Sequence, residues 1–201
     1  MKIYDTDIRQ ILYNSFLSEK DFIEEPDTVI INELDVCAGV SRVDIAVVNG
    51  KIHGYEIKSK QDNLERLPSQ IESYNCVFDT MTIVTYKSHL AKIKTIVPKW
   101  WGIKCIDERN GNVILKNIRK PKENSNISIR NVAMLLWKNE MIDLLLNYCD
   151  ITEGYKSKTR SDLSYMIQKY VDSSFVQEYV RNVLKNRINW KAVPLVKQNG
   201  D

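Results

Sequence analysis

The stretch that decides the fold is Val43-Asp44-Ile45-Ala46-Val47-Val48-Asn49-Gly50-Lys51-Ile52-His53-Gly54-Tyr55-Glu56-Ile57-Lys58. Two runs rich in alternating apolar residues flank an Asn-Gly pair, which is the pattern of a β-hairpin. The first arm carries Asp44, and the second carries Glu56 and Lys58. Two carboxylates and an ammonium grouped on paired strands are typical of a site where a divalent metal acts on a phosphodiester.

Because side chains alternate between the two faces of a strand, the turn decides whether the acids meet. A two-residue loop of Asn49 and Gly50 pairs Asp44 with Tyr55 and puts the two acids on opposite faces. A three-residue loop over residues 48–50, with Gly50 left-handed beside a bulge, shifts the pairing by one residue. We therefore expect the bulged turn.

In the bulged register, one face of the hairpin carries charged residues and the other carries apolar residues. Asp44 pairs with Gly54 and Arg42 with Glu56, so that Asp44, Glu56 and Lys58 share one face. Gly54 then leaves space where a metal and a phosphate could approach. An Arg42–Glu56 ion pair across the strands, without catalysis, is the alternative interpretation of the same charges. The other face is expected to be core, and its residues are Val43, Ile45, Val47, Tyr55 and Ile57.

The residue types suit magnesium chemistry. Mg²⁺ is commonly held by one or two carboxylates together with waters and substrate phosphate oxygens, which fits Asp44 and Glu56. The backbone carbonyl of Ile57 could add a ligand. Lys58 could position the attacking water or stabilise negative charge in the transition state.

A helix and a strand are predicted directly after the hairpin. Residues 69–78 have apolar residues at helical spacing, and Gln70 and Tyr74, four residues apart, lie on one face of this helix. Residues 81–86 form an apolar run of strand length. The predicted order is strand, turn, strand, helix, strand.

The run from Arg42 to Ser59, the segment Leu64-Glu65-Arg66-Leu67 and the spacing Gln70-x-x-x-Tyr74 together resemble the PD-(D/E)XK nuclease superfamily, which has the restriction-endonuclease-like fold. More narrowly, they resemble a family of small bacterial proteins within it. The resemblance extends over most of the chain, including Trp100-Trp101-Gly102 and a helical C-terminal part.

The resemblance implies roles for individual residues. Asp44 corresponds to the metal-binding acid of the second core strand, Glu56 to the second acid and Lys58 to the catalytic lysine. Gln70 and Tyr74 match the helix motif beside the active site, and Glu33, at the end of a strand or the start of a turn, matches an additional upstream acid. Val43 replaces the proline that gives the superfamily its name. The implied catalytic residues are Asp44, Glu56, Lys58 and Gln70, and the implied metal ligands are Glu33, Asp44, Glu56 and Ile57.

The composition is that of an ordinary globular protein. The 201 residues are 43% hydrophobic and 27% charged, with a net charge of +3 that permits nucleic-acid binding without requiring it. Neither a membrane-length apolar run nor a signal peptide is recognisable, so we expect a cytoplasmic protein. The four cysteines are too dispersed for a zinc site or a disulfide framework.

The fold class expected is α/β, with a restriction-endonuclease-like core whose central mixed β-sheet is flanked by helices, plus a C-terminal helical subdomain. The core occupies residues 1–116 and begins with a helix over residues 5–16. Two short strands are expected around an Asn110-Gly111 turn. A polar linker covers residues 117–128. The helical subdomain covers residues 129–201, with helices over 131–148, 160–171 and 174–187.

Two groups of residues are candidates for binding nucleic acid. Around the hairpin they are Arg42, Ser59 and Tyr74; in the C-terminal part they are Lys156, Lys158, Arg160, Arg181 and Lys185. Trp190 could stack on a base or pack on the helices. A solvated basic helix face is the alternative for the second group, because nearby acids dilute its charge.

Two functions from different classes follow. The first is a Mg²⁺-dependent deoxyribonuclease, an endonuclease rather than an exonuclease, with Mn²⁺ as a substitute, DNA as the partner and dimerisation possible. The second is a catalytically inactive nuclease-like domain that binds nucleic acid or a protein. A metal-binding fold without DNA is a third possibility. With no Ser-His-Asp or Cys-His arrangement recognisable, a covalent nucleophile is not expected, and His53 is expected to be a packed or hydrogen-bonded residue.

Overall fold

The computed structural model describes residues 5–109, 112–149, 154–155, 157–188 and 190–195. Its helices are α1 (Asp5–Phe16), α2 (Lys20–Ile23), η1 (Cys37–Gly39, a 3-10 turn), α3 (Leu67–Asn75), α4 (Lys87–Ile96), α5 (Ile129–Ala133), α6 (Lys138–Tyr148), α7 (Arg160–Tyr170) and α8 (Ser173–Asn186). Its strands are β1 (Val29–Val36), β2 (Ser41–Val48), β3 (Ile52–Lys58), β4 (Thr80–Tyr86), β5 (Gly102–Arg109), β6 (Asn112–Arg119) and β7 (Ala192–Pro194).

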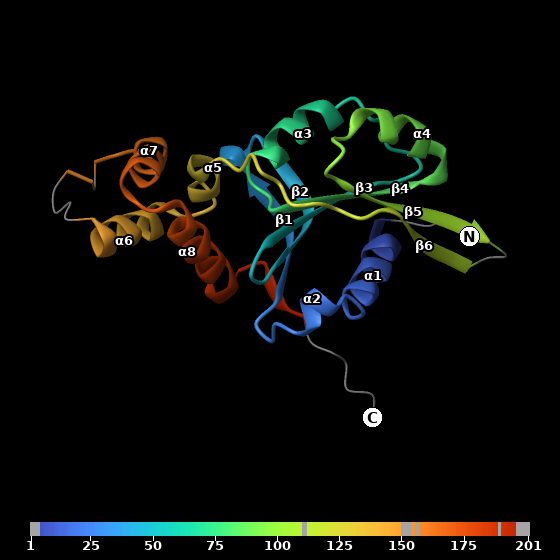
Figure 1. The fold of residues 1–201 in the computed structure, drawn as a ribbon, viewed down its shortest axis with the longest axis horizontal. Helices are drawn as coiled ribbons and strands as arrows, with labels where there is room; N and C mark the ends of the chain where they lie inside the picture. Colours follow the sequence, from blue (N-terminus) through green and yellow to red (C-terminus); the bar gives the residue numbers. More distant parts are fainter. Residues whose placement is uncertain (1–4, 110–111, 150–153, 156, 189, 196–201) are drawn as a thin grey trace.

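The strands form one seven-stranded mixed sheet in the order β6-β5-β4-β3-β2-β1-β7. β1, β2 and β3 pair antiparallel, β3, β4 and β5 pair parallel through α3 and α4, and β6 returns antiparallel beside β5. In Figure 1, α1 and α2 lie below the sheet and α3 and α4 lie above it. The expected α/β class, with a mixed sheet flanked by helices, is confirmed.

Two apolar clusters hold the layers together. On the α1 side, Ile8, Leu12 and Phe16 of α1 pack against Val47 and Tyr55 of the sheet. On the α3 side, a larger cluster runs from the sheet through α3 and α4 and continues into helices α5 to α8. The apolar stripe of α1 explains why this helix forms and which face it buries.

Strands β1 and β2 both change the face to which their apolar residues point. Ile45 packs in the α1-side cluster, whereas Val43 packs in the α3-side cluster, so the expectation that these two residues share a face is wrong. On β1, Ile30 and Leu34 are divided in the same way. The interruption on β1 falls at Glu33, whose φ of 52° lies in the left-handed region. Glu33 therefore lies inside a strand, and not at a strand end as expected.

The β2–β3 turn has three residues, but they are not the expected ones. Val48 pairs with Ile52, so the loop is residues 49–51 and the register is shifted by two residues from the predicted one. Among the described glycines only Gly39 and Gly154 have positive φ, so Gly50 is not left-handed. Because the loop again has an odd number of residues, the alternation of side chains still puts Asp44 and Glu56 on the same face. Continuing the register by one pair beyond Ile45 and Tyr55 places Asp44 opposite Glu56.

Gly54 does not provide space for a ligand. It pairs with Ala46, and a Cβ at this position would lie 2.1 Å from Met81 Sδ and 3.0 Å from the ring of Phe78. The predictions that Gly54 pairs with Asp44 and that open space lies beside it are therefore wrong. Glycine is required here because core side chains approach the backbone closely.

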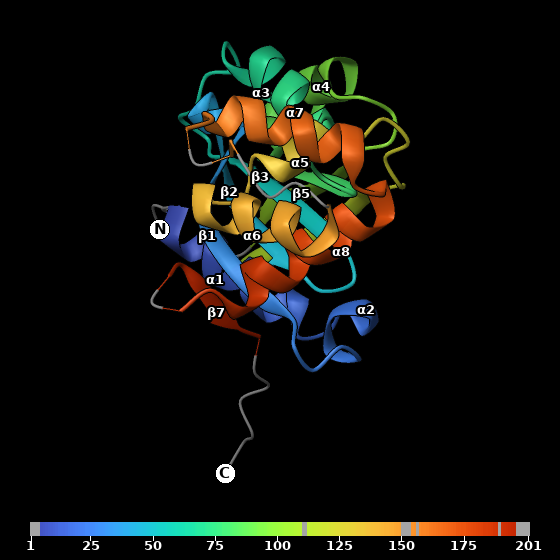
Figure 2. The ribbon, with the colours of Figure 1, turned by 90° about the vertical axis from the view of Figure 1, so that its left-hand side faces the viewer.

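The described C-terminal part contains more helices than expected, and a strand of the sheet follows them. The predicted helix over residues 131–148 is two helices, α5 and α6, and α6 begins where Glu140 Oε2 accepts from the backbone nitrogen of Trp137 at 2.6 Å. Figure 2 shows α5 to α8 in front of the sheet. β7 then pairs with β1, so the chain returns to the sheet after its last helix. No helix in the described ranges combines the length and apolar character needed to cross a membrane.

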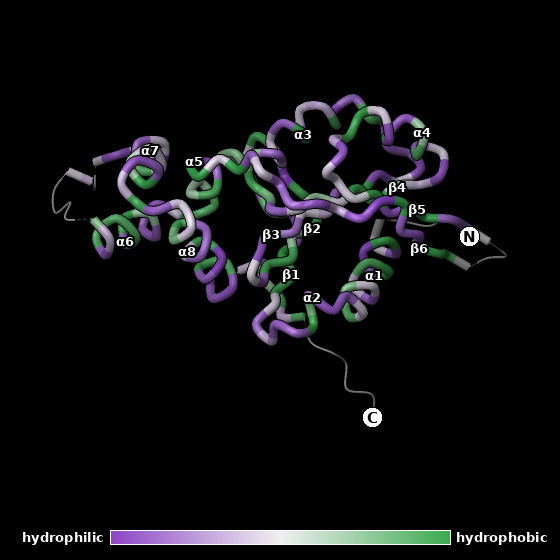
Figure 3. Tube along the Cα trace, in the orientation of Figure 1, coloured by the Kyte–Doolittle hydropathy of each residue, from purple (hydrophilic) through white to green (hydrophobic). Residues whose placement is uncertain are grey.

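The segment predicted as a linker is attached to the core. β6 extends to Arg119, and the following residues are largely hydrophilic in Figure 3. Asn124 donates from its side chain to the carbonyls of Asn75 and Phe78, at 2.8 and 3.0 Å. The backbone nitrogen of Ser128 bonds the carbonyl of Cys76 at 2.9 Å. These bonds fix the path from the sheet to α5.

Candidate active site

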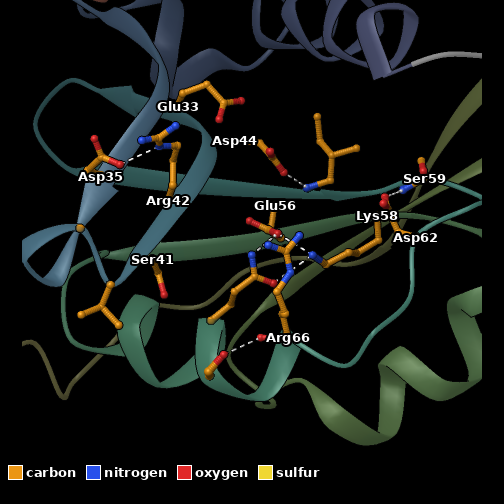
Figure 4. A pocket seen from close by; sticks show the side chains of 15 residues that line it. Glu33, Asp35, Ser41, Arg42, Asp44, Glu56, Lys58, Ser59, Asp62 and Arg66 are labelled. Atoms are coloured by element: carbon orange, nitrogen blue, oxygen red, sulfur yellow. Dashed lines mark hydrogen bonds and ion pairs between the residues drawn. The ribbon is translucent and has the colours of Figure 1, made fainter.

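A cavity of about 560 Å³ opens at the ends of β1, β2 and β3, where α3 begins. Most of the residues implicated by the sequence line it, although they come from positions up to 37 residues apart, Glu33 to Gln70. Figure 4 shows these side chains around one space. The predicted residues that line the cavity are Glu33, Arg42, Asp44, Glu56, Ile57, Lys58, Ser59 and Gln70.

Glu56, Lys58 and Gln70 form one hydrogen-bonded group. Lys58 Nζ donates to Glu56 Oε1 at 2.7 Å and to Gln70 Oε1 at 2.9 Å, and Gln70 Nε2 donates to Glu56 Oε1 at 2.7 Å. Glu56 and Lys58 are two residues apart on β3 and so share a face, as Figure 4 shows. α3 supplies Gln70 from its first turn. The predicted proximity of these three side chains is thus present in the structure.

Tyr74 lies beneath Glu56. Its hydroxyl is 2.8 Å from Glu56 Oε2 and 2.7 Å from the carbonyl oxygen of Arg42, so its one proton serves two acceptors. Burial, and then the neighbouring Glu56 carboxylate, raise the pKa of Tyr74 far above its ordinary value. The side chain has no exposed surface, so Tyr74 holds Glu56 in place and cannot touch nucleic acid as predicted.

Asp44 lies beside the backbone of Ile57. Its Oδ2 accepts from the backbone nitrogen of Ile57 at 2.6 Å. Its other oxygen, Oδ1, is 3.2 Å from Nη2 of Arg9, and the same nitrogen is 2.5 Å from Glu33 Oε1. Asp44 and Glu33 therefore share a guanidinium that comes from α1.

The sequence reasoning missed Arg9. Arg9 and Tyr13 are one turn apart on α1, and both reach Asn32 of β1: Tyr13 OH at 2.5 Å and Arg9 Nη1 at 3.4 Å from its Oδ1. One signal was available, because Arg9 is a basic residue directly beside the buried apolar residue Ile8 on an amphipathic helix. That signal does not reveal which acids the side chain meets.

The rim of the cavity also differs from the prediction. Arg42 Nε donates to Asp35 Oδ1 of β1 at 2.6 Å, so the alternative ion pair between Arg42 and Glu56 is wrong. The backbone nitrogen of Ser59 donates to Asp62 Oδ2 at 2.6 Å. Among the lining residues that were not predicted, the charged ones are Asp35, Asp62 and Arg66.

The carboxylate and carbonyl oxygens of the cavity are ligands that suit a hard divalent cation, but the acidic side chains do not converge on one point. Within the described residues, no group of three or more His, Cys, Asp or Glu side chains is placed to hold a metal ion. Glu33 and Asp44 meet at Arg9, whereas Glu56 is bonded to Lys58, Gln70 and Tyr74. Mg²⁺ often needs only one or two protein carboxylates with several waters. By donor chemistry the site fits Mg²⁺ through Asp44 and the carbonyl of Ile57.

The described basic residues predicted in the C-terminal part, Lys158, Arg160, Arg181 and Lys185, lie outside the lining of this cavity. Arg160 Nη2 donates to the backbone carbonyls of Met134 and Leu136, at 2.5 and 2.9 Å, and thereby ties α7 to the α5–α6 connection. Lys185 pairs with Asp27 at 2.5 Å. Of the other basic residues predicted to bind nucleic acid here, Lys158 is exposed and Arg181 is half-buried. Lys156 lies outside the described residues.

Trp190 packs on protein. The guanidinium carbon of Arg187 lies 4.2 Å from the ring centre of Trp137 and 4.3 Å from that of Trp190. Arg187 also binds Glu140, at 2.6 Å. The tryptophans therefore hold a buried cation at the start of α6 and the end of α8.

Comparison with known proteins gives the family. The model described as bacteriophage P4 protein cII matches residues 3–199. The chain belongs to this family. One curated cII relative, "Protein cII" of Enterobacteria phage P4, is 29% identical over 161 residues, which are 80% of this chain and 60% of the relative. The chain thus spans about three fifths of the length of that cII protein.

One solved structure also resembles this cII-family chain. It is the SPO1766 protein of unknown function from Silicibacter pomeroyi, with a TM-score of 0.39 and 17% identity over 64% of this chain and 84% of that one. This likeness is too distant to carry an argument. Membership of the PD-(D/E)XK superfamily stays a prediction.

Proposed function

We propose that this cII-family protein is a metal-dependent nuclease that hydrolyses phosphodiester bonds in DNA, an endonuclease of the PD-(D/E)XK type. The observation that carries the proposal is the convergence of Asp44, Glu56, Lys58 and Gln70 on one cavity. The order of elements supports it, because β2, β3, α3 and β4 follow one another as the strand, turn, strand, helix and strand that were predicted for the segment carrying the resemblance.

The residues divide the proposed chemistry between them. Bound Mg²⁺ or Mn²⁺ would supply Lewis-acid stabilisation of the phosphate. Asp44 and the Ile57 carbonyl would hold the ion, with Glu56 as the second acid. Lys58, held by Glu56 and Gln70, would orient a water or stabilise charge on the phosphate oxygens. Arg42 and Ser59, on the rim, would contact the flanking phosphates.

The second candidate is an inactive nuclease-like domain that binds nucleic acid or a protein. One observation favours it: every carboxylate oxygen of Glu56 already accepts a hydrogen bond from Lys58, Gln70 or Tyr74. An acid so occupied is a good structural group and a poor metal ligand until its partners rearrange. The nuclease proposed above would act in the cytoplasm and could form a homodimer.

Incubation with DNA separates the two functions. Supercoiled plasmid, linear duplex and single-stranded DNA are each incubated with purified protein in Mg²⁺, in Mn²⁺ or in chelator. We expect cleavage with metal only, and its loss in Asp44→Ala and Lys58→Ala. Asp35→Asn, a neutralised acid in the same cavity but outside the proposed set, is the matched control and should still cleave. Equal cleavage by the wild type and both alanine variants would remove the assignment. Chelator-sensitive binding without cleavage would favour the second candidate.

A further inference from the structure

We propose that Arg9 is a tethered cation that occupies the position between Glu33 and Asp44, and that a divalent metal can load only when the guanidinium withdraws. The proposal rests on the proposed function, since it concerns the same acids. It assigns a positioning role to α1, none of whose described side chains is among the residues that line the cavity.

The contacts of Arg9 place its charge at the meeting point of the two acids. Nη2 is 2.5 Å from Glu33 Oε1 and 3.2 Å from Asp44 Oδ1, and Nη1 is 2.8 Å from the backbone carbonyl oxygen of Asp44. Glu33 and Asp44 lie at the same level of β1 and β2, between the pairs Asn32–Ile45 and Leu34–Val43. Without a cation between them, two facing carboxylates would repel one another.

The local backbone also brings the acids to this point. The left-handed φ of Glu33, 52°, is an uncommon conformation for a residue with a side chain. It coincides with the change of face in β1, and so it directs Glu33 toward the α1 layer where Arg9 lies. Lys191 Nζ donates to the carbonyl oxygen of Glu33 at 2.7 Å and helps to hold this conformation.

A guanidinium and a metal at this position are alternatives. Asp44 Oδ1 contacts Arg9 and Oδ2 contacts the Ile57 nitrogen, so a metal on Asp44 must compete with an existing hydrogen bond. A divalent ion at bonding distance from Oδ1 would also lie within a few ångströms of the positive guanidinium, and like charges at that range repel. Arg9 is 17% exposed, and its long side chain can swing outward without unfolding α1.

Metal binding without DNA tests this role. The dissociation constant for Mn²⁺ is measured by titration calorimetry for the wild type, Arg9→Gln, Arg9→Lys and Arg66→Gln. We expect Arg9→Gln to bind Mn²⁺ about tenfold more tightly, as an opposing charge and a competing bond are both removed. Arg9→Lys should lie between it and the wild type. Arg66→Gln removes the same charge from the cavity wall and should change the constant by less than about twofold.

A measurement on the wild type tests the same role without depending on how the variants fold. The side-chain Nε–Hε signal of Arg9 is followed by NMR as Mg²⁺ is added, and we expect it to shift as the guanidinium leaves the acids. Unchanged Mn²⁺ affinity in Arg9→Gln, or an Arg9 signal that metal leaves unmoved while binding is seen, overturns the proposal and leaves the nuclease intact. Absence of binding in the wild type and Arg9→Gln alike overturns both.

Discussion

Glu56 Oε1 accepts a hydrogen bond from Lys58 Nζ at 2.7 Å, with the two side chains only 3% and 8% exposed. Two charges so far from water cost desolvation free energy, which their attraction and the bonds to Gln70 and Tyr74 must offset. The pair is therefore the point at which the candidate site and the stability of the fold are most closely linked.

Breaking this pair should be costly. In Lys58→Met we expect the free energy of unfolding to fall by about 3–5 kcal/mol, because Glu56 is left buried with its charge uncompensated. The double variant Glu56→Gln/Lys58→Met should lose less than the sum of the two single changes, by about 1–3 kcal/mol. Urea denaturation of the four proteins measures this coupling.

An exposed pair on the same rim serves as the control. Asp35→Asn, which removes the partner of Arg42, should cost less than about 1 kcal/mol because both side chains are about half exposed. Additive losses in the Glu56 and Lys58 cycle would contradict the buried geometry.

Removing only the hydroxyl of Tyr74 should also destabilise the protein. Tyr74→Phe keeps the ring, whose centre lies 5.7 Å from that of Phe78 and 6.1 Å from that of Trp101. It removes the donor for Glu56 and for the Arg42 carbonyl, so we expect a loss of about 1–3 kcal/mol in the free energy of unfolding. Tyr165→Phe, at a tyrosine that is 58% exposed, is the matched control. Equal effects of the two substitutions would show that the Tyr74 hydroxyl contributes nothing.

His53 should make stability depend on pH. Burial, with the nearby Lys51, lowers the pKa of His53 from 6.5 to about 4. Between these values the unfolded chain binds a proton that the folded protein does not, so stability rises with pH and is lost as pH falls from 6.5 toward 4. The full contribution, on the order of 3 kcal/mol, is present above pH 6.5. Urea denaturation at several pH values measures it.

His53→Gln is the variant that isolates this effect. Glutamine can replace the hydrogen bonds of the ring with Thr80 and Asn49 but cannot take up a proton in this range. The slope of stability against pH between 4 and 6.5 should therefore become shallower. An unchanged slope would assign the acid sensitivity to other groups.

Gly54→Ala should destabilise the core. The new methyl group would overlap Met81 Sδ, and overpacking of this kind costs about 1–3 kcal/mol. Gly50→Ala is the control, because the atoms nearest to its methyl group would be those of the flexible carboxylate of Glu25. Thermal denaturation compares the two variants. If Gly54→Ala were as stable as Gly50→Ala, the close packing of β3 on Met81 would be incorrect.

The sequence predicted the order of elements well where the signals are local. The first helix was predicted over residues 5–16, which are the bounds of α1, and the helices over 160–171 and 174–187 differ from α7 and α8 by one residue. Apolar periodicity and capping residues act within a few positions, so they can be read without knowing the fold. The helix over 131–148 was not divided, because the cap that starts α6 uses a backbone nitrogen that the pattern does not reveal.

The candidate site was predicted in part for a related reason. The alternation along β3 predicted that Glu56 and Lys58 share a face of that strand, and the helical spacing predicted that Gln70 and Tyr74 share a face of α3. The group that these residues form could therefore be expected from the periods of a strand and a helix. The turn was placed one residue too early, and Gly54 was assigned to open space that Met81 fills. Register depends on how neighbouring layers pack, and that information is not local.

By itself, the sequence determined which side chains carry the charge and on which faces of β3 and α3 they lie, because periods of 2 and 3.6 residues are properties of the backbone. Only the tertiary structure decided that Arg9 of α1 meets Glu33 and Asp44, that Tyr74 is buried beneath Glu56, and that β7 closes the sheet beside β1. These contacts join residues far apart in the chain. They follow from the packing of whole layers against the sheet, which no local pattern specifies.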